Sequence, residues 1–242
     1  MKGKDLLIIL NPRRYEPSLK SLKALNIPKV WITGYTEKGA VAQLNKIVEE
    51  TNYQHYITQS DDVIVKQEQI DAITNNNKDY DILSGWCNLV PGKPNVNVCP
   101  VEWGKKLTLS SKPLEKPWPL KEDYPFYDEK YTYENIMNKI DSEIFETYNI
   151  GFSFTSFKRK VLLEYPLDVY TSIGSRNKGN QWVGKRETNF GSDHHISHRI
   201  VSDGKYKMYV HKKAFFEHLK LKKTGPGRFQ VGAHYQKITW ET

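Results

Sequence analysis

The predicted organisation of the chain centres on residues 53–65, Tyr53-Gln54-His55-Tyr56-Ile57-Thr58-Gln59-Ser60-Asp61-Asp62-Val63-Ile64-Val65. Its first half is rich in aromatic and β-branched residues, which favour a strand, and this strand ends at two adjacent carboxylates, Asp61 and Asp62. In open α/β sheets, ligands bind outside the carboxyl ends of the strands. Two carboxylates there can hold a divalent cation, which can neutralise phosphate charge. Because aspartate is also a common helix N-cap, the pair taken alone favours a capped turn before a helix at 63–74.

The composition indicates a soluble globular protein. The chain has 242 residues, of which 26% are charged and 38% hydrophobic. No run of residues approaches the roughly 20 apolar positions that a membrane span needs, so we expect no transmembrane segment. The two cysteines, Cys87 and Cys99, do not form a metal-type cluster, which makes a reducing, cytoplasmic compartment the default expectation.

The net charge of +8 admits partners that carry phosphate or another anionic group. The lysines are spread along the whole chain and do not gather in one block. This distribution is typical of a solvated surface, whereas a nucleic-acid interface concentrates its basic residues. We therefore do not expect nucleic acid to be a partner.

Strands and helices alternate along the first part of the chain. The apolar run at 5–10 and the segment at 29–33 predict buried strands, and apolar spacing predicts helices at 18–25 and 40–51. The strand that ends at Asp61 follows. This order is typical of a parallel sheet with right-handed crossovers, so we predict a mixed, mostly parallel α/β sheet flanked by helices in a single domain over 1–242.

The second part of the chain is less regular. We predict strands at 80–89, 96–99, 151–157, 206–210 and 214–216, and helices at 134–148, 158–165 and 192–200. Recurring prolines predict an irregular insertion at 105–133, and the residues from 220 to 242 form a basic tail. The glycine-rich loop at 174–191, which contains Trp182, and the segment at 224–227 have the composition of lids.

Four segments, in this order, resemble GT-A fold glycosyltransferases, closest to the family-2 type. They are the early strand that ends in Asn11-Pro12, the helix Gly39-Ala40-Val41-Ala42-Gln43-Leu44-Asn45, the segment Gln59-Ser60-Asp61-Asp62-Val63 and the segment Asp193-His194-His195-Ile196-Ser197-His198-Arg199. The third segment lies where the family has its Asp-x-Asp motif. The fourth is similar to the Asp-x-x-x-x-x-Arg helix of that family, and His218 falls where such enzymes often have a third metal ligand.

The resemblance implies a Rossmann-like GT-A domain that transfers a sugar from a nucleotide-diphosphate sugar to an acceptor, which is a glycan, a protein or a lipid. It implies a nucleotide-binding half at 1–100 and an acceptor-binding half at 101–242. The residues it assigns to the nucleotide sugar are Asn11, Pro12, Arg13, Tyr35, Gln43, Gln59, Ser60 and Asp61. Its metal ligands, for Mn²⁺ or Mg²⁺, are Asp61, Asp62 and His218.

One position departs from the family pattern, because Gln59 replaces the first acid of the motif. Its amide can still hydrogen bond to a ribose or uracil group, and Asp61 then becomes the main metal carboxylate, with Asp62 assisting. Arg13, Lys222 and Arg228 are candidate cations for the diphosphate.

The resemblance implies that Asp193 is the general base of an inverting transfer, whereas the local sequence indicates a helix N-cap equally well. His194, His195 and His198 lie beside it without a zinc-protease signature, so we expect acceptor contacts or surface histidines.

Two other functions remain open. A nucleotidyltransferase also uses an α/β sheet and a carboxylate-bound metal, but Asn11-Pro12-Arg13-Arg14 lacks the usual glycines after the first strand. A basic protein that binds nucleic acid or an anionic surface without catalysis is the third possibility, and salt-sensitive binding with no effect of Mn²⁺ would identify it.

Overall fold

Strand β1 (Asp5–Asn11) lies inside the main sheet and is covered on both faces. Its residues alternate between two cores, with Leu6 and Ile8 in one and Leu7 and Ile9 in the other. This double burial explains why the strand is a continuous apolar run without polar alternation.

The structure is a computed structural model that describes residues 4–11, 16–33, 36–89, 93–104, 129–173, 187–219 and 237–241. Its main sheet contains, in spatial order, β12 (Lys237–Glu241), β2 (Lys29–Thr33), β1, β3 (His55–Ser60), β7 (Phe154–Lys158), β5 (Ile82–Trp86), β10 (Met208–Phe215) and β6 (Ile144–Thr147). Two small sheets pair β4 (Val63–Ile64) with β11 (Glu217–His218) and β8 (Tyr170–Ile173) with β9 (Glu187–Phe190).

The main sheet is mixed and mostly parallel in direction. Strands β1, β2 and β3 pair in parallel, as do β5 and β10, while β7 is antiparallel to both β3 and β5. Five strands therefore run one way, and β12, β7 and β6 run the other way. This result confirms the predicted fold class, and it is consistent with the GT-A-like fold that the resemblance implied.

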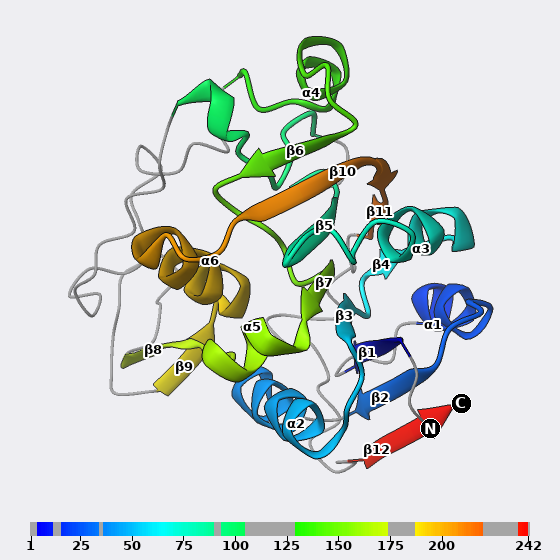
Figure 1. The fold of residues 1–242 in the computed structure, drawn as a ribbon. Coiled ribbons are helices and arrows are strands. Elements are labelled where there is room, and N and C mark those ends of the chain that lie inside the picture. Colours follow the sequence, from blue (N-terminus) through cyan, green and yellow to red (C-terminus); the bar gives the residue numbers. More distant parts are fainter. Residues whose placement is uncertain are drawn as a thin grey trace, which may run out of the picture.

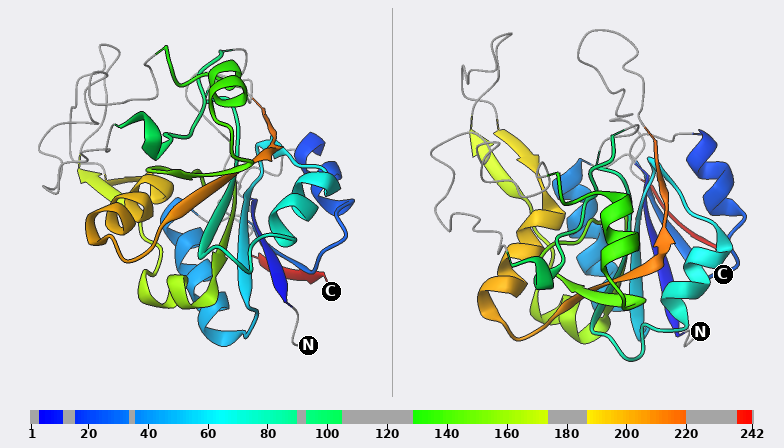
Figure 2. Two further views of the ribbon diagram at one scale, coloured as in Figure 1. Left: turned by 45° about the horizontal axis from the view of Figure 1, so that its top comes forward. Right: turned by 90° about the horizontal axis from the view of Figure 1, so that it is seen from above.

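Helices cover both faces of the sheet (Figures 1 and 2). One face packs against α2 (Glu37–Glu50), α5 (Arg159–Glu164) and α6 (Ser192–Asp203), and the other against α1 (Glu16–Lys23) and α3 (Gln67–Thr74). A third core lies under α4 (Tyr133–Lys139), near the short 3-10 helix η1 (Val101–Trp103). No helix in these described ranges is long and apolar enough to cross a membrane.

Several sequence predictions about single elements are wrong. The segment 63–74 begins with strand β4, and its helix starts only at Gln67. The segment 134–148 contains α4 and then strand β6, and 96–99 is not a strand but contains one isolated bridge, at Val96. The two predicted strands at 206–210 and 214–216 are one strand, β10.

The tail contains strand β12, which was not predicted and pairs antiparallel with β2. The loop at 174–191 ends in β9, also unpredicted. The rest of that loop, most of the 105–133 insertion and the tail from 220 to 236 lie outside the described residues.

Candidate active site

The carboxyl ends of the parallel strands meet at one edge of the sheet, where α/β proteins bind ligands. Register places Asn11, at the end of β1, beside Thr33, at the end of β2, and Leu10 beside Ser60 of β3. The two acids Asp61 and Asp62 form the turn that follows β3. The strand therefore delivers both acids to the carboxyl edge of the parallel strands, as its sequence predicted.

Asp62 faces His218 at this edge. The imidazole Nε2 atom of His218 lies 3.5 Å from the Oδ2 atom of Asp62, and their side chains are 25% and 17% exposed. Strand β11 brings them together, because His218 pairs with Val63 and the amide of Leu219 donates to the carbonyl of Asp62 over 2.7 Å. The hydroxyl of Ser60 donates to Oδ1 of Asp62 over 2.6 Å and orients the carboxylate. The pair is therefore fixed on both sides and remains open to solvent.

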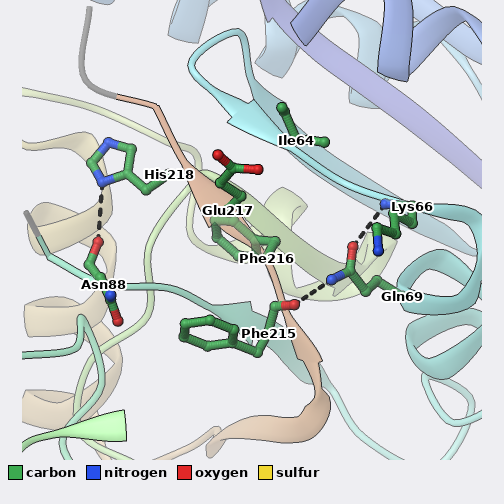
Figure 3. Close-up of a pocket in the computed structure, with 8 residues that line it drawn as sticks. All are labelled: Ile64, Lys66, Gln69, Asn88, Phe215, Phe216, Glu217 and His218. Carbon is green, nitrogen blue, oxygen red and sulfur yellow. Dashed lines mark hydrogen bonds between the residues drawn. The ribbon is translucent and has the colours of Figure 1, made fainter. Parts of the chain in front are cut away.

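The orientation of the His218 ring is set by Asn88, which follows β5 (Figure 3). The Nδ1 atom of His218 lies 3.1 Å from the carbonyl oxygen of Asn88. Because a carbonyl can only accept, Nδ1 carries a proton, and Nε2 is the ring nitrogen that faces Asp62. Metal-binding histidines commonly have this arrangement, in which the second ring nitrogen donates to a carbonyl.

The other two residues of the motif are buried. Asp61 and Gln59 are both 0% exposed. The Nε2 atom of Gln59 donates to the carbonyl of Ser60 over 3.2 Å, and its Oε1 atom accepts no hydrogen bond from the described residues. The roles predicted for Asp61 as main metal ligand and for Gln59 toward a nucleotide stay predictions.

The described residues contain no group of three His, Cys, Asp or Glu side chains that could hold a metal ion. The structure thus pairs Asp62 with His218, but Asp61 does not complete a group of three with them. A carboxylate and an imidazole nevertheless form a donor set that suits Mn²⁺. Since two protein ligands leave most positions of such an ion open, substrate oxygens and water would complete its coordination.

Asp193 lies at the second residue of α6, directly after Ser192. Its Oδ1 atom accepts a hydrogen bond of 2.8 Å from the backbone amide of His194. This contact fixes the carboxylate at the helix N-terminus, and the side chain is partly exposed. The N-cap of α6 is Gly191, so the N-cap role predicted for Asp193 is wrong, whereas its role as a general base stays a prediction.

The amino ends of α2 and α6 are joined by Glu37. Its Oε1 atom accepts hydrogen bonds from the backbone amide of Ser192 at 3.1 Å and from the hydroxyl of Ser192 at 3.0 Å. Burial of this carboxyl end raises its pKa above the usual value, hydrogen bonds from Ser192 and Gly191 oppose that shift, and the charge of Asp193 adds to it. Sequence reasoning missed Glu37, because its partner is 155 positions away.

A chain of polar contacts connects α6 to the end of β5. Nδ1 of His194 lies 3.2 Å from Oδ1 of Asn149, whose amide donates to the carbonyl of Asn97 over 3.2 Å. The Oδ1 atom of Asn97 accepts from the amide of Cys87 over 2.9 Å. Cys87 precedes Asn88, the residue that orients His218. The two predicted carboxylates, Asp62 and Asp193, are therefore connected by a short series of contacts at one edge of the sheet.

The electrostatics of Cys87 agree with this placement. Burial raises the pKa of its thiol above the usual value, and the nearby negative charges of Asp62 and then Asp193 raise it further. Both carboxylates therefore lie in the neighbourhood of Cys87, because charge effects fall with distance.

The remaining predicted residues divide into two groups. Gln43 is partly exposed on α2, and Arg199 donates to the carbonyl of Pro166 over 2.9 Å and lies over the ring of Tyr165, so it fastens α6 to the segment after α5. The residues that lie outside the described part of the chain are Pro12, Arg13, Tyr35, Trp182, Lys222 and Arg228.

Comparison with solved structures gives likenesses of fold at low sequence identity. No protein-family model and no curated protein matches the sequence. A solved structure of GalNAc-T7 with UDP, GalNAc and Mn²⁺ is similar at a TM-score of 0.48 and 13% identity, over 93% of this chain and 44% of that one. A197 from STIV is similar at a TM-score of 0.42 and 12% identity, over 94% of this chain and 99% of that one.

Proposed function

We propose that this chain is a glycosyltransferase that moves a sugar from a nucleotide-diphosphate sugar to an acceptor hydroxyl, with a divalent cation and with inversion at the anomeric carbon. The observation that carries the proposal is the pair Asp62 and His218 at the carboxyl edge of β3, with His218 oriented by Asn88. The pair supplies a carboxylate oxygen and an imidazole nitrogen to one point in space.

Asp62 and His218 would hold Mn²⁺ or Mg²⁺, and the histidine favours Mn²⁺. When bound, the cation supplies Lewis-acid stabilisation of the leaving diphosphate. The hydroxyl of Ser60 and the carbonyl of Asn88 keep the two ligands in position, so the site is organised before substrate arrives. On the same proposal, Asn11 and Gln43 contact the nucleotide in the half at 1–100.

Asp193 is proposed to be the general base. The acceptor oxygen forms a bond to the anomeric carbon, the bond from that carbon to the diphosphate oxygen breaks, and the acceptor proton moves to the Asp193 carboxylate. The contact with His194 leaves one carboxylate oxygen for this task. Glu37 holds the start of α6 through Ser192 and so positions the helix that carries Asp193. Such a chain would be similar to family-2 enzymes, with the acceptor in the half at 101–242.

Hydrolysis of a panel of nucleotide sugars tests the proposal. We expect wild type to release UDP or GDP slowly, and Mn²⁺ to stimulate this release. The Asp62→Asn and His218→Gln variants should release neither nucleotide. His218→Gln can still donate to the carbonyl of Asn88 but loses the imidazole lone pair. Asp79→Asn, an exposed turn aspartate, is the matched control. Release that is equal in wild type and Asp62→Asn would remove this pair from the mechanism.

Asp193→Asn separates the two roles of that residue. An asparagine can keep the contact with the amide of His194 but cannot take a proton. We therefore expect retained binding of the nucleotide sugar and loss of transfer. Loss of binding together with a lower melting temperature would assign Asp193 a structural role only.

A further inference from the structure

A cavity of about 380 Å³ opens beside His218 (Figure 3). Its walls come from β4, the start of α3, the end of β5 and the β10–β11 segment. The sheet order places β1 and β2 on one side of β3, and β5 and β10 on the other. The cavity therefore lies next to His218, one of the proposed cation ligands, between the β4–α3 segment and the β10–β11 segment. Its volume is at the lower end of the range for small-ligand sites, roughly 300–1,000 Å³.

The lining combines one apolar wall with scattered polar groups. Phe215 and Ile64 are partly buried hydrophobic residues, while Lys66, Glu217 and Asn88 offer a cationic donor, an anionic acceptor and an amide. One positive and one negative side chain leave the lining without a net charge, which does not suit a free phosphate or a carboxylate ligand. A neutral ligand with hydroxyls on its edges and an apolar face fits this combination.

The ring of Phe215 belongs to an aromatic cluster that reaches the surface. Its centroid lies 4.8 Å from that of Trp86 and 4.6 Å from that of Tyr133, and Trp86 and Tyr133 are stacked at 5.5 Å. Tyr133 is 41% exposed and Met137, one turn later on α4, is 39% exposed. A rigid group of aromatic rings that extends from a cavity to the protein surface can pack against the C–H faces of two successive pyranose rings.

We propose that this cavity binds a saccharide unit of the acceptor, so that the acceptor class is a glycan. The assignment of an acceptor, though not the saccharide binding itself, rests on the glycosyltransferase function proposed above. Phe215 covers the apolar face of the sugar, while Asn88, Lys66 and Glu217 bind its hydroxyls. Tyr133 extends the site by one unit.

Saturation-transfer NMR tests this site without nucleotide or Mn²⁺, using the full chain. The probes are methyl glycosides of glucose, galactose, mannose and N-acetylglucosamine, with uridine as a comparison ligand. We expect at least one glycoside to bind and Phe215→Leu, which keeps an apolar side chain but removes the ring, to weaken that binding roughly tenfold. Leu163→Ala, on α5 and 43% exposed, is the matched control and leaves binding unchanged.

Three results would overturn the proposal. They are binding of no glycoside, glycoside binding that is equal in Phe215→Leu and wild type, and uridine binding that depends on Phe215 in place of glycoside binding. Failure of the glycosyltransferase function looks different. In that case glycosides still bind through Phe215, but no nucleotide sugar is hydrolysed in the presence of Mn²⁺.

Discussion

Replacing Glu37 by alanine tests how the helix that carries Asp193 is held. The carboxylate of Glu37 accepts from both the amide and the hydroxyl of Ser192, at 3.1 and 3.0 Å. Loss of a capping side chain costs about 0.5–2 kcal/mol, and each intramolecular hydrogen bond that is lost costs about 0.5–1.5 kcal/mol. The Glu37 residue as a whole is exposed, so water replaces part of its lost hydrogen bonds to Ser192. We therefore expect Glu37→Ala to lower the free energy of unfolding by about 1–2 kcal/mol.

Urea denaturation and thermal melting measure this change. For a chain of this size, about 1–2 kcal/mol corresponds to a fall in Tm of roughly 2–8 °C. Glu37→Gln keeps an oxygen acceptor for Ser192 and should lose less. Glu50→Ala, at the opposite end of α2, removes only an exposed pair with Lys46 and is the control. If Glu37→Ala and Glu50→Ala had the same melting temperature, the link between α2 and α6 would contribute nothing to stability.

The pH dependence of the same position has a definite sign. Burial raises the pKa of the Glu37 carboxyl above its ordinary value of 4.5, so the folded protein holds this proton at a pH where the unfolded chain has released it. Its contribution to stability therefore falls as pH rises from 4.5 through the raised pKa. Glutamine has no such titration. The stability of wild type relative to Glu37→Gln should increase as pH is lowered from 7 toward 4.5, and a decrease would contradict the assignment.

Three further predictions concern the scaffold. A Cβ atom on Gly85 would lie 2.7 Å from the carbonyl oxygen of Ala214, so Gly85→Ala should destabilise the fold by about 1–3 kcal/mol in urea, and wild-type stability would refute this contact between β5 and β10. Burial raises the pKa of Cys87, so its thiol should not react with a thiol reagent at pH 8 until the chain is unfolded, and prompt modification would contradict its burial. The amide of Asn45 bonds both backbone groups of Leu167, at 2.8 and 2.9 Å, so Asn45→Ala should lower the unfolding free energy by about 1–3 kcal/mol, and an unchanged value in denaturant titration would refute that role.

The sheet was largely predictable because its local signals agree with its tertiary environment. The apolar run of β1 and the helical spacing of α2 match their burial on the sheet. The errors occur where pairing with a distant segment decides the structure. Val63 and Ile64 are a strand only because β11 pairs with them, and β12 is a strand only because it pairs with the edge of β2. A short segment carries too little pattern to reveal such a partner.

The candidate site was predictable in part for the same reason. Asp62 follows a recognisable strand, and Asp193 follows Ser192 at the start of a predicted helix, so both were visible in the sequence. The resemblance, and no local pattern, pointed to His218. Glu37 and Asn88 have no local signal at all, because each acts on a residue far along the chain. Residues that orient a site are found from coordinates, whereas residues at strand ends can be found from sequence.

Calorimetric titration of UDP in the presence of Mn²⁺, with wild type and His218→Gln side by side, tests the cation site most directly. We predict that wild type binds UDP only when Mn²⁺ is present. His218→Gln should not bind UDP with or without Mn²⁺, although both proteins have the same melting temperature. Equal, Mn²⁺-independent binding of UDP by the two proteins would contradict a cation held between Asp62 and His218.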